Sequence, residues 1–316
     1  MKTIPLFVLI ILTASAVIAE WQCPHGKLLV YYCVDSGYYD LFRLSFGSLL
    51  SVLSPKEHSC VGVVVLVPQI NASTAHEFRA RLREEKQACW SVVPVVFPLS
   101  ATGVAVRDEE TLGRFRVFEV PDTANYTVAL YVDADTLFVK SPLSLMLRSG
   151  ALKNGQVYAV PTGTSTSAQF NSRYFGLHHY SSQQVDGFIR DGVKPMNSGV
   201  FCFNLQSHTI AMMRDLYYFA MREIFAGTKH FVDQSFFNHY LLTHRLGNTT
   251  FLKGHVQMAS GKVGETVAKS STVVLHFIAA GLGSHQYKLQ RMQAYLDNHH
   301  TRHLNWKMKE CQNKKD

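Results

Sequence analysis

The stretch VALYVDADTLFV, residues 128–139, decides which kind of fold this chain can form. Its first five residues are apolar, which is typical of a parallel strand buried on both faces. Asp133 and Asp135 follow that strand, at the end where open α/β sheets bind their ligands. Residues two apart in an extended chain project to the same side, so both carboxylates can face one point. A solvated Asp-x-Asp loop is the alternative, but the apolar residues on both sides favour a buried strand end.

Two carboxylates held at one point usually need a cation between them. Oxygen ligands suit Mg²⁺ or Mn²⁺, metals that commonly also hold the phosphates of a substrate. His276 lies in a second apolar run, residues 273–277. A single histidine in a strand is more often structural, but here the two aspartates need a further ligand. Imidazole favours Mn²⁺ over Mg²⁺, so the sequence predicts a Mn²⁺ site made of Asp133, Asp135 and His276.

Short apolar runs alternate with segments of helical spacing along most of the chain. This alternation predicts an α/β fold built on a mostly parallel sheet. Strands are expected at residues 27–33, 60–67, 92–97, 128–132, 157–161, 195–205 and 273–277, and helices at 41–53, 75–87, 109–120, 210–225 and 233–242. Residues 162–193 show no clear period and predict a long loop or a small insertion over the site.

The first residues have the features of a secretory signal. Lys2 is followed by an apolar run at residues 6–12 and by small residues before position 20. We expect a signal peptide at residues 1–19, one catalytic domain at 20–290 and a polar, basic tail at 291–316. An uncleaved signal-anchor is the alternative, and only then would the protein be attached to a membrane.

Three sequons, at Asn71, Asn125 and Asn248, add to this expectation. Together with the signal they predict passage through the ER and Golgi lumen, or secretion. Six cysteines follow the signal, and Cys33 and Cys202 lie in apolar runs that suit buried thiols. The other pairings stay open.

The formal charge of +8 comes from scattered basic residues, with a concentration only near the C-terminus. That pattern is typical of a solvated surface, so no nucleic-acid partner is expected. A positive field still favours anionic substrates such as nucleotide diphosphates.

Five motifs, taken in order, resemble glycosyltransferase family eight, the retaining nucleotide-sugar transferases that include glycogenin and galactinol synthase. They are VDSGYY (34–39), LYVDADTLFV (130–139), MNSGVF (196–201), VDQSFFN (232–238) and LHFIAAG (275–281). The resemblance spans most of the mature chain. It implies a single Rossmann-like nucleotide-sugar-binding domain of the GT-A type, with a mostly parallel central sheet and an inserted loop region.

The resemblance also implies the role of each matched residue. Asp133, Asp135 and His276 would hold Mn²⁺. The remaining donor-site residues would be Asp35 and Tyr38 at the uracil, Asn197 and Gly199 at the sugar, Gly281 at the diphosphate, and Asp233 and Gln234 beside the anomeric carbon. A basic residue ahead of the Asp-x-Asp strand would be Arg114 or Arg116, and the spacing favours Arg116.

The implied reaction moves a hexose or pentose from a UDP-sugar to a hydroxyl of a carbohydrate, glycoprotein or polyol acceptor. The chain departs from the family by lacking Lys-Pro-Trp after the histidine loop, which leaves Lys288 and His285 as candidate replacements. One alternative is an inactive, transferase-like sugar-binding protein. Another is a metal-dependent phosphohydrolase, which normally has Thr or Val where this chain has Leu137. The sugar, the acceptor and the oligomeric state stay open at this point.

Overall fold

The computed structural model describes residues 23–69, 80, 92–98, 111–146, 149–163, 165–170, 175, 179–226, 232–278 and 285–299. Several predictions fall outside these residues: the signal peptide at 1–19, nearly all of the helix at 75–87, residues 300–316 of the tail, the sequon at Asn71, and Gly281.

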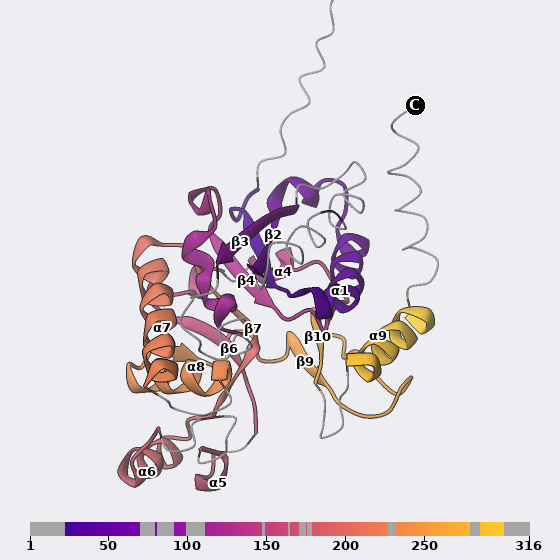
Figure 1. The fold of residues 1–316 in the computed structure, drawn as a ribbon. Coiled ribbons are helices and arrows are strands. Elements are labelled where there is room, and N and C mark those ends of the chain that lie inside the picture. The colour runs from indigo at the N-terminus through magenta and orange to yellow at the C-terminus, as the bar shows by residue number, and fades with distance from the viewer. Residues whose placement is uncertain are drawn as a thin grey trace, which may run out of the picture.

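A seven-stranded sheet lies at the centre of the described part of the molecule (Figure 1). In spatial order its strands are β3 (Val92–Pro98), β2 (Val61–Gln69), β1 (Leu28–Cys33), β4 (Val128–Val132), β7 (Met196–Asn204), β6 (Val157–Pro161) and β8 (Gly247–Asn248). The first four run parallel. β7 runs antiparallel to both β4 and β6, and β6 and β8 are parallel. The predicted mostly parallel α/β sheet is confirmed.

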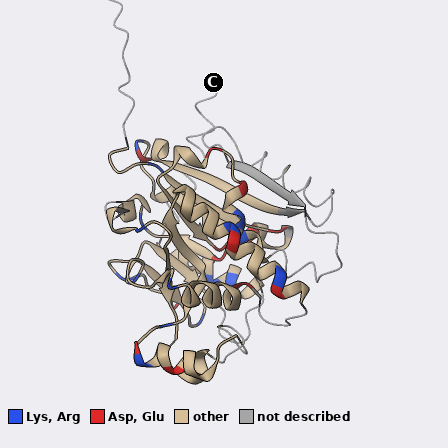
Figure 2. Ribbon diagram, turned by 90° about the vertical axis from the view of Figure 1, so that its left-hand side faces the viewer, with Lys and Arg blue, Asp and Glu red and all other residues tan. Residues whose placement is uncertain are grey.

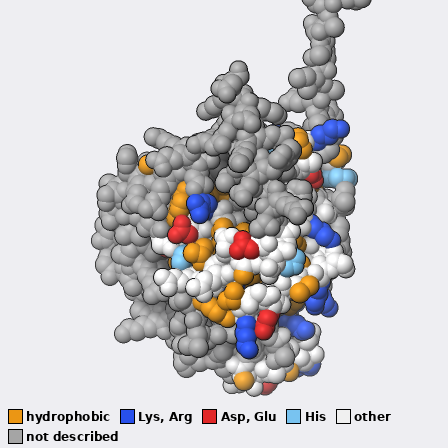
Figure 3. All heavy atoms as spheres, turned by 90° about the vertical axis from the view of Figure 1, so that its right-hand side faces the viewer, with side chains coloured by type: hydrophobic (Ala, Val, Ile, Leu, Met, Phe, Trp, Pro, Cys, Tyr) orange, Lys and Arg blue, Asp and Glu red, His pale blue; other side chains and the backbone are white. Residues whose placement is uncertain are grey.

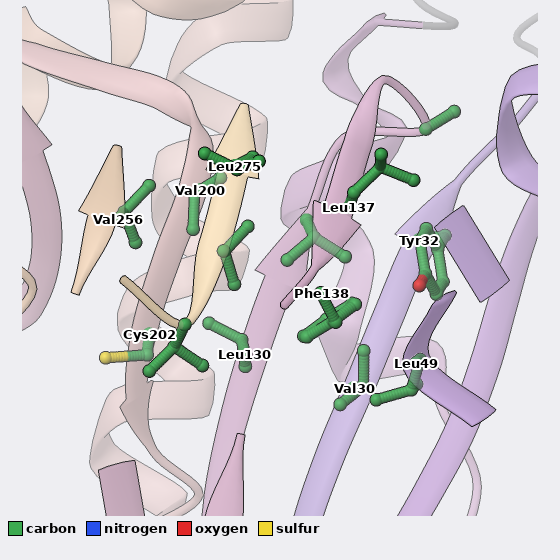
Figure 4. Packing of buried hydrophobic residues seen from close by; sticks show 14 of the residues in the cluster. Val30, Tyr32, Leu49, Leu130, Leu137, Phe138, Val200, Cys202, Val256 and Leu275 are labelled. Atoms are coloured by element: carbon green, nitrogen blue, oxygen red, sulfur yellow. The ribbon is translucent and has the colours of Figure 1, made fainter. Parts of the chain in front are cut away.

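The continuous apolar runs of these strands are explained by burial on both faces. In β1, Leu28, Val30 and Tyr32 pack into one core, whereas Leu29 and Tyr31 pack into the other. Side chains alternate between the two faces of a strand, so a strand covered on both sides has no polar position. Figure 4 shows the first of these cores between the strands.

Helices cover both faces of the sheet (Figure 1). On one side lie α1 (Tyr39–Val52) and α9 (His285–His299), and on the other α7 (Ser207–Phe225) and α8 (Val232–Thr243). The shorter helical elements are η1 (Ser36–Tyr38), η2 (Glu57–Cys60), η3 (Gly113–Glu119), η4 (Thr123–Asn125), α4 (Leu143–Met146), η5 (Ser149–Ala151), α5 (Ser167–Phe170) and α6 (Ser182–Arg190). The helix expected at residues 109–120 is therefore mostly 3₁₀ helix, with non-helical backbone at Arg116.

A second sheet of three strands supplies the histidine of the site. Its order is β5 (Thr136–Phe138), β10 (Val274–Phe277) and β9 (Val256–Ala259). β5 is the continuation of the Asp-x-Asp stretch, and β10 pairs with it in antiparallel orientation. The chain therefore leaves the large sheet at the two aspartates and enters the small sheet directly after them.

Of the two interpretations of residues 162–193, a long loop or a small insertion, the structure favours the insertion. The segment contains α5 and α6, with Phe170, Tyr180 and Val185 in a small core of their own. The side chain of Ser181 caps α6 and accepts a hydrogen bond from the backbone N–H of Gln184. The stretch escaped detection because both helices are short and carry few apolar residues.

The predicted domain boundary at residue 290 is wrong. α9 runs through that position, and Met292, Tyr295 and Leu296 are buried in the core that also contains β1 and β10. The three residues form a narrow apolar stripe among polar neighbours, so the helix resembles a polar tail in sequence.

Cys23 and Cys60 form a disulfide, while Cys33 and Cys202 remain thiols, as expected. Acidic and basic residues are interspersed over the described residues in two views of the molecule (Figures 2 and 3). Within the part of the chain that is described, no helix has the length and apolar character needed to cross a membrane.

Candidate functional site

Asp133, Asp135 and His276 meet where the two sheets join. The β5–β10 pairing places His276 opposite Thr136, and the backbone N–H of Phe277 donates to the carbonyl of Asp135 over 2.9 Å. His276 Nε2 lies 3.2 Å from Asp135 Oδ1 and 3.7 Å from Asp133 Oδ2. One ligand atom from each of the three residues lies within 4.8 Å of the others. The predicted ligand set is therefore assembled in space.

Burial and charge shape this cluster. Asp135 and His276 are buried, whereas a quarter (25%) of the Asp133 side chain is exposed. Burial raises the pKa of Asp133, an effect that Arg114 opposes and Asp135 reinforces. Burial would also raise the pKa of Asp135, but His276 and Lys288 hold it well below its usual range. Asp135 is thus a buried carboxylate that stays charged.

The residues present fit a divalent cation. Two carboxylates and an imidazole form a donor set suited to Mn²⁺. Asp135 Oδ1 faces only His276 Nε2, at 3.2 Å, and His276 Nδ1 is a buried atom without a hydrogen-bond partner. A carboxylate oxygen and an imidazole nitrogen that face each other in a buried site can both turn to one metal ion. The cluster can bind a metal, and its residues do not by themselves select Mn²⁺ over other divalent ions.

Gly199 lies against this cluster because β7 pairs with β4. Its carbonyl accepts the backbone N–H of Asp133 over 2.7 Å. A Cβ at this position would lie 2.4 Å from Asp133 Oδ2 and 2.4 Å from His276 Cε1. Glycine is therefore required for space rather than for backbone conformation, and the prediction that Gly199 lines the site agrees with its position.

Arg114, and not Arg116, is the basic residue of the site. Arg114 Nη1 lies 3.3 Å from Asp133 Oδ1 and 2.9 Å from Asp233 Oδ2. Arg116 points away, where it pairs with Glu119 and donates to the Tyr217 hydroxyl. The preference for Arg116, which rested on spacing ahead of the Asp-x-Asp strand, is wrong, because the segment is 3₁₀ helix with non-helical backbone at Arg116 and turns Arg114 toward the aspartates.

Asp233 and Gln234 join the site at the start of α8. Asp233 Oδ2 accepts the Ser198 hydroxyl over 2.6 Å. Gln234 Oε1 accepts Asn197 Nδ2 over 3.1 Å and the Ser198 backbone N–H over 3.2 Å. The predicted Asn-Ser-Gly strand and the Asp-Gln helix start are therefore linked by hydrogen bonds. Ser198 connects them and also receives Arg114 at its carbonyl oxygen, a role the sequence did not reveal.

Asp35 and Tyr38 lie at the carboxyl end of β1. Asp35 Oδ1 accepts the backbone N–H groups of Gly37 over 2.7 Å and Tyr38 over 3.2 Å, which shapes the turn η1. The Tyr38 ring is 41% exposed, and its edge-on partner is His285, with ring centroids 5.2 Å apart. Tyr38 thus offers an aromatic surface at the site's edge, as stacking on a base requires.

Lys288 reaches the cluster from the first turns of α9. Its Nζ lies 2.5 Å from Asp135 Oδ2. Burial would lower the pKa of Lys288, but Asp135 raises it above its ordinary value, so the side chain stays cationic. Of the two replacement candidates, Lys288 contacts the Asp135 carboxylate and His285 contacts Tyr38. The sequence left Lys288 as a candidate but did not indicate its contact with Asp135, because that contact depends on how α9 packs against β10.

Comparison with known proteins identifies the fold. No family model matches the chain, and no curated protein matches it in sequence. A solved structure of the WbbM bifunctional glycosyltransferase does match, with a TM-score of 0.54 and 12% identity over 86% of this chain and 49% of that one. The chain has a Rossmann-like GT-A fold. It spans about half the length of WbbM, at 49%.

Two further structures match less closely. Mouse xyloside xylosyltransferase 1 has a TM-score of 0.48 and 11% identity, covering 80% of this chain and 97% of that one. The glycosyltransferase GlyE of Streptococcus pneumoniae TIGR4 has a TM-score of 0.46 and 15% identity, covering 88% and 64%. The match to WbbM, at 12% identity, shows the fold alone, so activity has to be argued from the site itself.

Proposed function

We propose that this protein is a retaining glycosyltransferase of family eight type, which moves a hexose or pentose from a UDP-sugar to an acceptor hydroxyl with the help of Mn²⁺. The observation that carries the proposal is the cluster of Asp133, Asp135 and His276 at the strand ends of a GT-A fold. The five motifs of the sequence resemblance support it, because the described members of four of them converge on this cluster. The fifth, around Asp35 and Tyr38, lies at its edge through His285 and Lys288.

Asp133, Asp135 and His276 would together hold the metal. A bound Mn²⁺ would stabilise the negative charge that develops on the diphosphate as the sugar leaves. Neighbouring side chains hold Asp133 in place. Its Oδ1 accepts a hydrogen bond from the Tyr131 hydroxyl over 2.7 Å and also faces Arg114. These contacts leave Asp133 Oδ2 directed to His276.

The donor sugar would lie beside Asn197, Gly199, Asp233 and Gln234. Asp233 is held by Arg114 and Ser198, and Gln234 by Asn197, so their oxygens have fixed positions. Fixed carboxylate and amide oxygens can stabilise an oxocarbenium-like sugar. Ser235, the next residue, is fully buried and is not a carboxylate. The proposal therefore favours substitution on one face of the sugar without a covalent intermediate from this helix.

A panel of UDP-sugars with Mn²⁺, scored by UDP release, tests the proposal. The natural protein should release UDP from at least one sugar, and excess chelator should stop the release. Asp135→Asn should abolish release, with Asp186→Asn on the exposed surface of α6 as the matched control that keeps it. UDP release that persists in chelator, or in Asp135→Asn, would contradict the metal-dependent transferase. Binding of sugars without any UDP release would leave the inactive, sugar-binding alternative.

We also propose that the protein acts in the secretory pathway. The sequons and the signal-like residues 1–19 motivate this, and a disulfide between Cys23 and Cys60 suits an oxidising compartment. Asn125 is exposed, so it is the described sequon most open to a glycan. Glycosidase treatment of protein from a eukaryotic host should shift its gel mobility, and Asn125→Gln should reduce that shift. A cytosolic product with no shift would contradict the proposal.

A further inference from the structure

Lys288 occupies a position that a metal ion would contest. Its ammonium group is hydrogen-bonded to Asp135 Oδ2, while Asp135 Oδ1 faces His276. Asp135 is therefore held between a cation and an imidazole within the chain itself. A divalent ion bound to Asp135, Asp133 and His276 would lie close to the ammonium, and like charges at such distances repel strongly in a partly buried site.

The helix that carries Lys288 is firmly anchored. Met292, Tyr295 and Leu296 of α9 are buried in the same core as β10. The side chain of Lys288 itself is 20% exposed. A long, partly exposed side chain on a fixed helix can change rotamer without moving the backbone. Lys288 can thus leave Asp135 while α9 stays in place.

A second cation lies one turn further along α9. Arg291 is 2% exposed, and its Nη1 donates to the carbonyl of Ile278 over 3.0 Å. Its Nε and Nη2 are buried and have no hydrogen-bond partner. The guanidinium also lies over the rings of Phe277, next to His276, and of Tyr287. Unpaired donors of a buried guanidinium are costly, and an anion such as phosphate is the ligand that satisfies them best.

From these contacts we propose that Lys288 is a built-in counter-ion of Asp135, which a divalent cation displaces. The released ammonium, together with Arg291 one turn further along α9, then binds the diphosphate of the nucleotide. This inference rests on the proposed function, and it assigns to α9 the leaving-group contacts of the site. In this arrangement the metal and the nucleotide bind cooperatively, because the first frees a cation that the second needs.

Lys288→Gln is expected to change the affinities for Mn²⁺ and for UDP in opposite directions. Lys288→Gln removes the competing charge, so Mn²⁺ alone should bind about tenfold tighter than to the natural protein. The same variant loses a charged contact to phosphate, so UDP at saturating Mn²⁺ should bind about tenfold more weakly. Tenfold is the lower end of what a hydrogen bond to a charged group is worth. A residue that only stabilised the fold would not produce this reversal.

Isothermal titration of the full chain with Mn²⁺ alone, and with UDP at saturating Mn²⁺, measures both effects. Lys288→Arg should restore the natural behaviour in part, because it keeps a cation at this position. Lys253→Gln, an exposed lysine outside the site, is the control for the loss of one positive charge. Arg291→Gln should weaken UDP binding and tighten Mn²⁺ less than Lys288→Gln does, since Lys288 is the cation hydrogen-bonded to Asp135. A melting curve for each variant confirms that it is folded.

The outcomes separate this inference from the proposed function. Mn²⁺ affinity that is unchanged or weaker in Lys288→Gln would overturn it, because the ion pair would then be purely structural. So would tighter Mn²⁺ without any loss in UDP binding. A natural protein that binds Mn²⁺ but no UDP would refute the transferase, and it would also remove the nucleotide half of the inference. Tighter Mn²⁺ with weaker UDP supports both.

Discussion

Gly199→Ala tests whether the space around the aspartate–histidine cluster is a metal site. The new Cβ would lie 2.4 Å from Asp133 Oδ2, and 2.4 Å and 2.9 Å from His276 Cε1 and Nε2. Ordinary contacts of this kind are about 3.5 Å, so the side chains would have to retreat by roughly 1 Å. Metal sites tolerate shifts of about 0.2 Å in ligand distance. A displacement several times larger should remove the site.

The expected result is a loss of Mn²⁺ affinity of about a hundredfold or more, since changes that merely reorient a ligand already cost about ten- to a hundredfold. The fold should survive, because overpacking a core position typically costs about 1–3 kcal/mol. Isothermal titration with Mn²⁺ alone measures the first quantity and denaturant unfolding the second. Both measurements need no substrate, so they do not depend on the identity of the sugar.

Gly187→Ala is the matched control. Gly187 lies within α6, and an added Cβ would meet only Arg190 Nη2, at 3.8 Å. Alanine in place of a helical glycine is expected to raise the free energy of unfolding by up to about 1 kcal/mol, with Mn²⁺ binding unchanged. If Gly199→Ala bound Mn²⁺ as tightly as the natural protein does, the metal would have to bind elsewhere. Equal losses in both variants would show that the effect is unspecific.

Three further predictions concern the surroundings of the site. Arg114→Ala should lower metal-dependent activity about ten- to a hundredfold, because it removes a partner of a metal ligand. Arg116→Ala should lower the melting temperature and leave the activity unchanged. Equal activity losses in the two variants would argue against the Arg114 assignment. Replacing Cys23 and Cys60 by serine should lower the free energy of unfolding by about 3–4 kcal/mol, judged from the loop that the disulfide closes, as denaturant unfolding would measure. Burial, with nearby His244, lowers the pKa of His239 in the folded protein. As the pH falls, the unfolded chain therefore binds a proton at this histidine first, so the free energy of unfolding should decrease below about pH 6.5. Melting curves should show a smaller decrease for His239→Gln.

Sequence pattern was sufficient for every strand of the large sheet except the two-residue β8, because strands such as β1 and β4 are buried on both faces. A run such as that of β1 has no polar position, since Leu29 and Tyr31 enter one core while Val30 and Tyr32 enter the other. The same pattern marks strand ends, where Asp133 and Asp135 lie. Local sequence therefore revealed the strands and their polar ends.

The site's assembly needed information that no single segment contains. The approach of His276 to Asp135 depends on the antiparallel pairing of β10 with β5, two strands more than 130 residues apart in the chain. The choice between Arg114 and Arg116 depended on the local backbone, which is 3₁₀ helix with non-helical torsion angles at Arg116 (φ −84°, ψ 27°). Distance along the sequence from the Asp-x-Asp strand does not contain that information.

The predicted boundary at residue 290 cuts through α9 and concealed Arg291. α9 packs through Met292, Tyr295 and Leu296, which lie three or four residues apart, as a helical stripe requires. Polar residues surround this stripe, so average composition indicated a tail while spacing indicated a helix. The boundary left Lys288 inside the predicted domain, where it was a candidate phosphate contact, but it excluded Arg291 on the same helix. The structure brings the Lys288 ammonium onto Asp135 and the Arg291 guanidinium, with two unpaired nitrogens, next to the strand of His276.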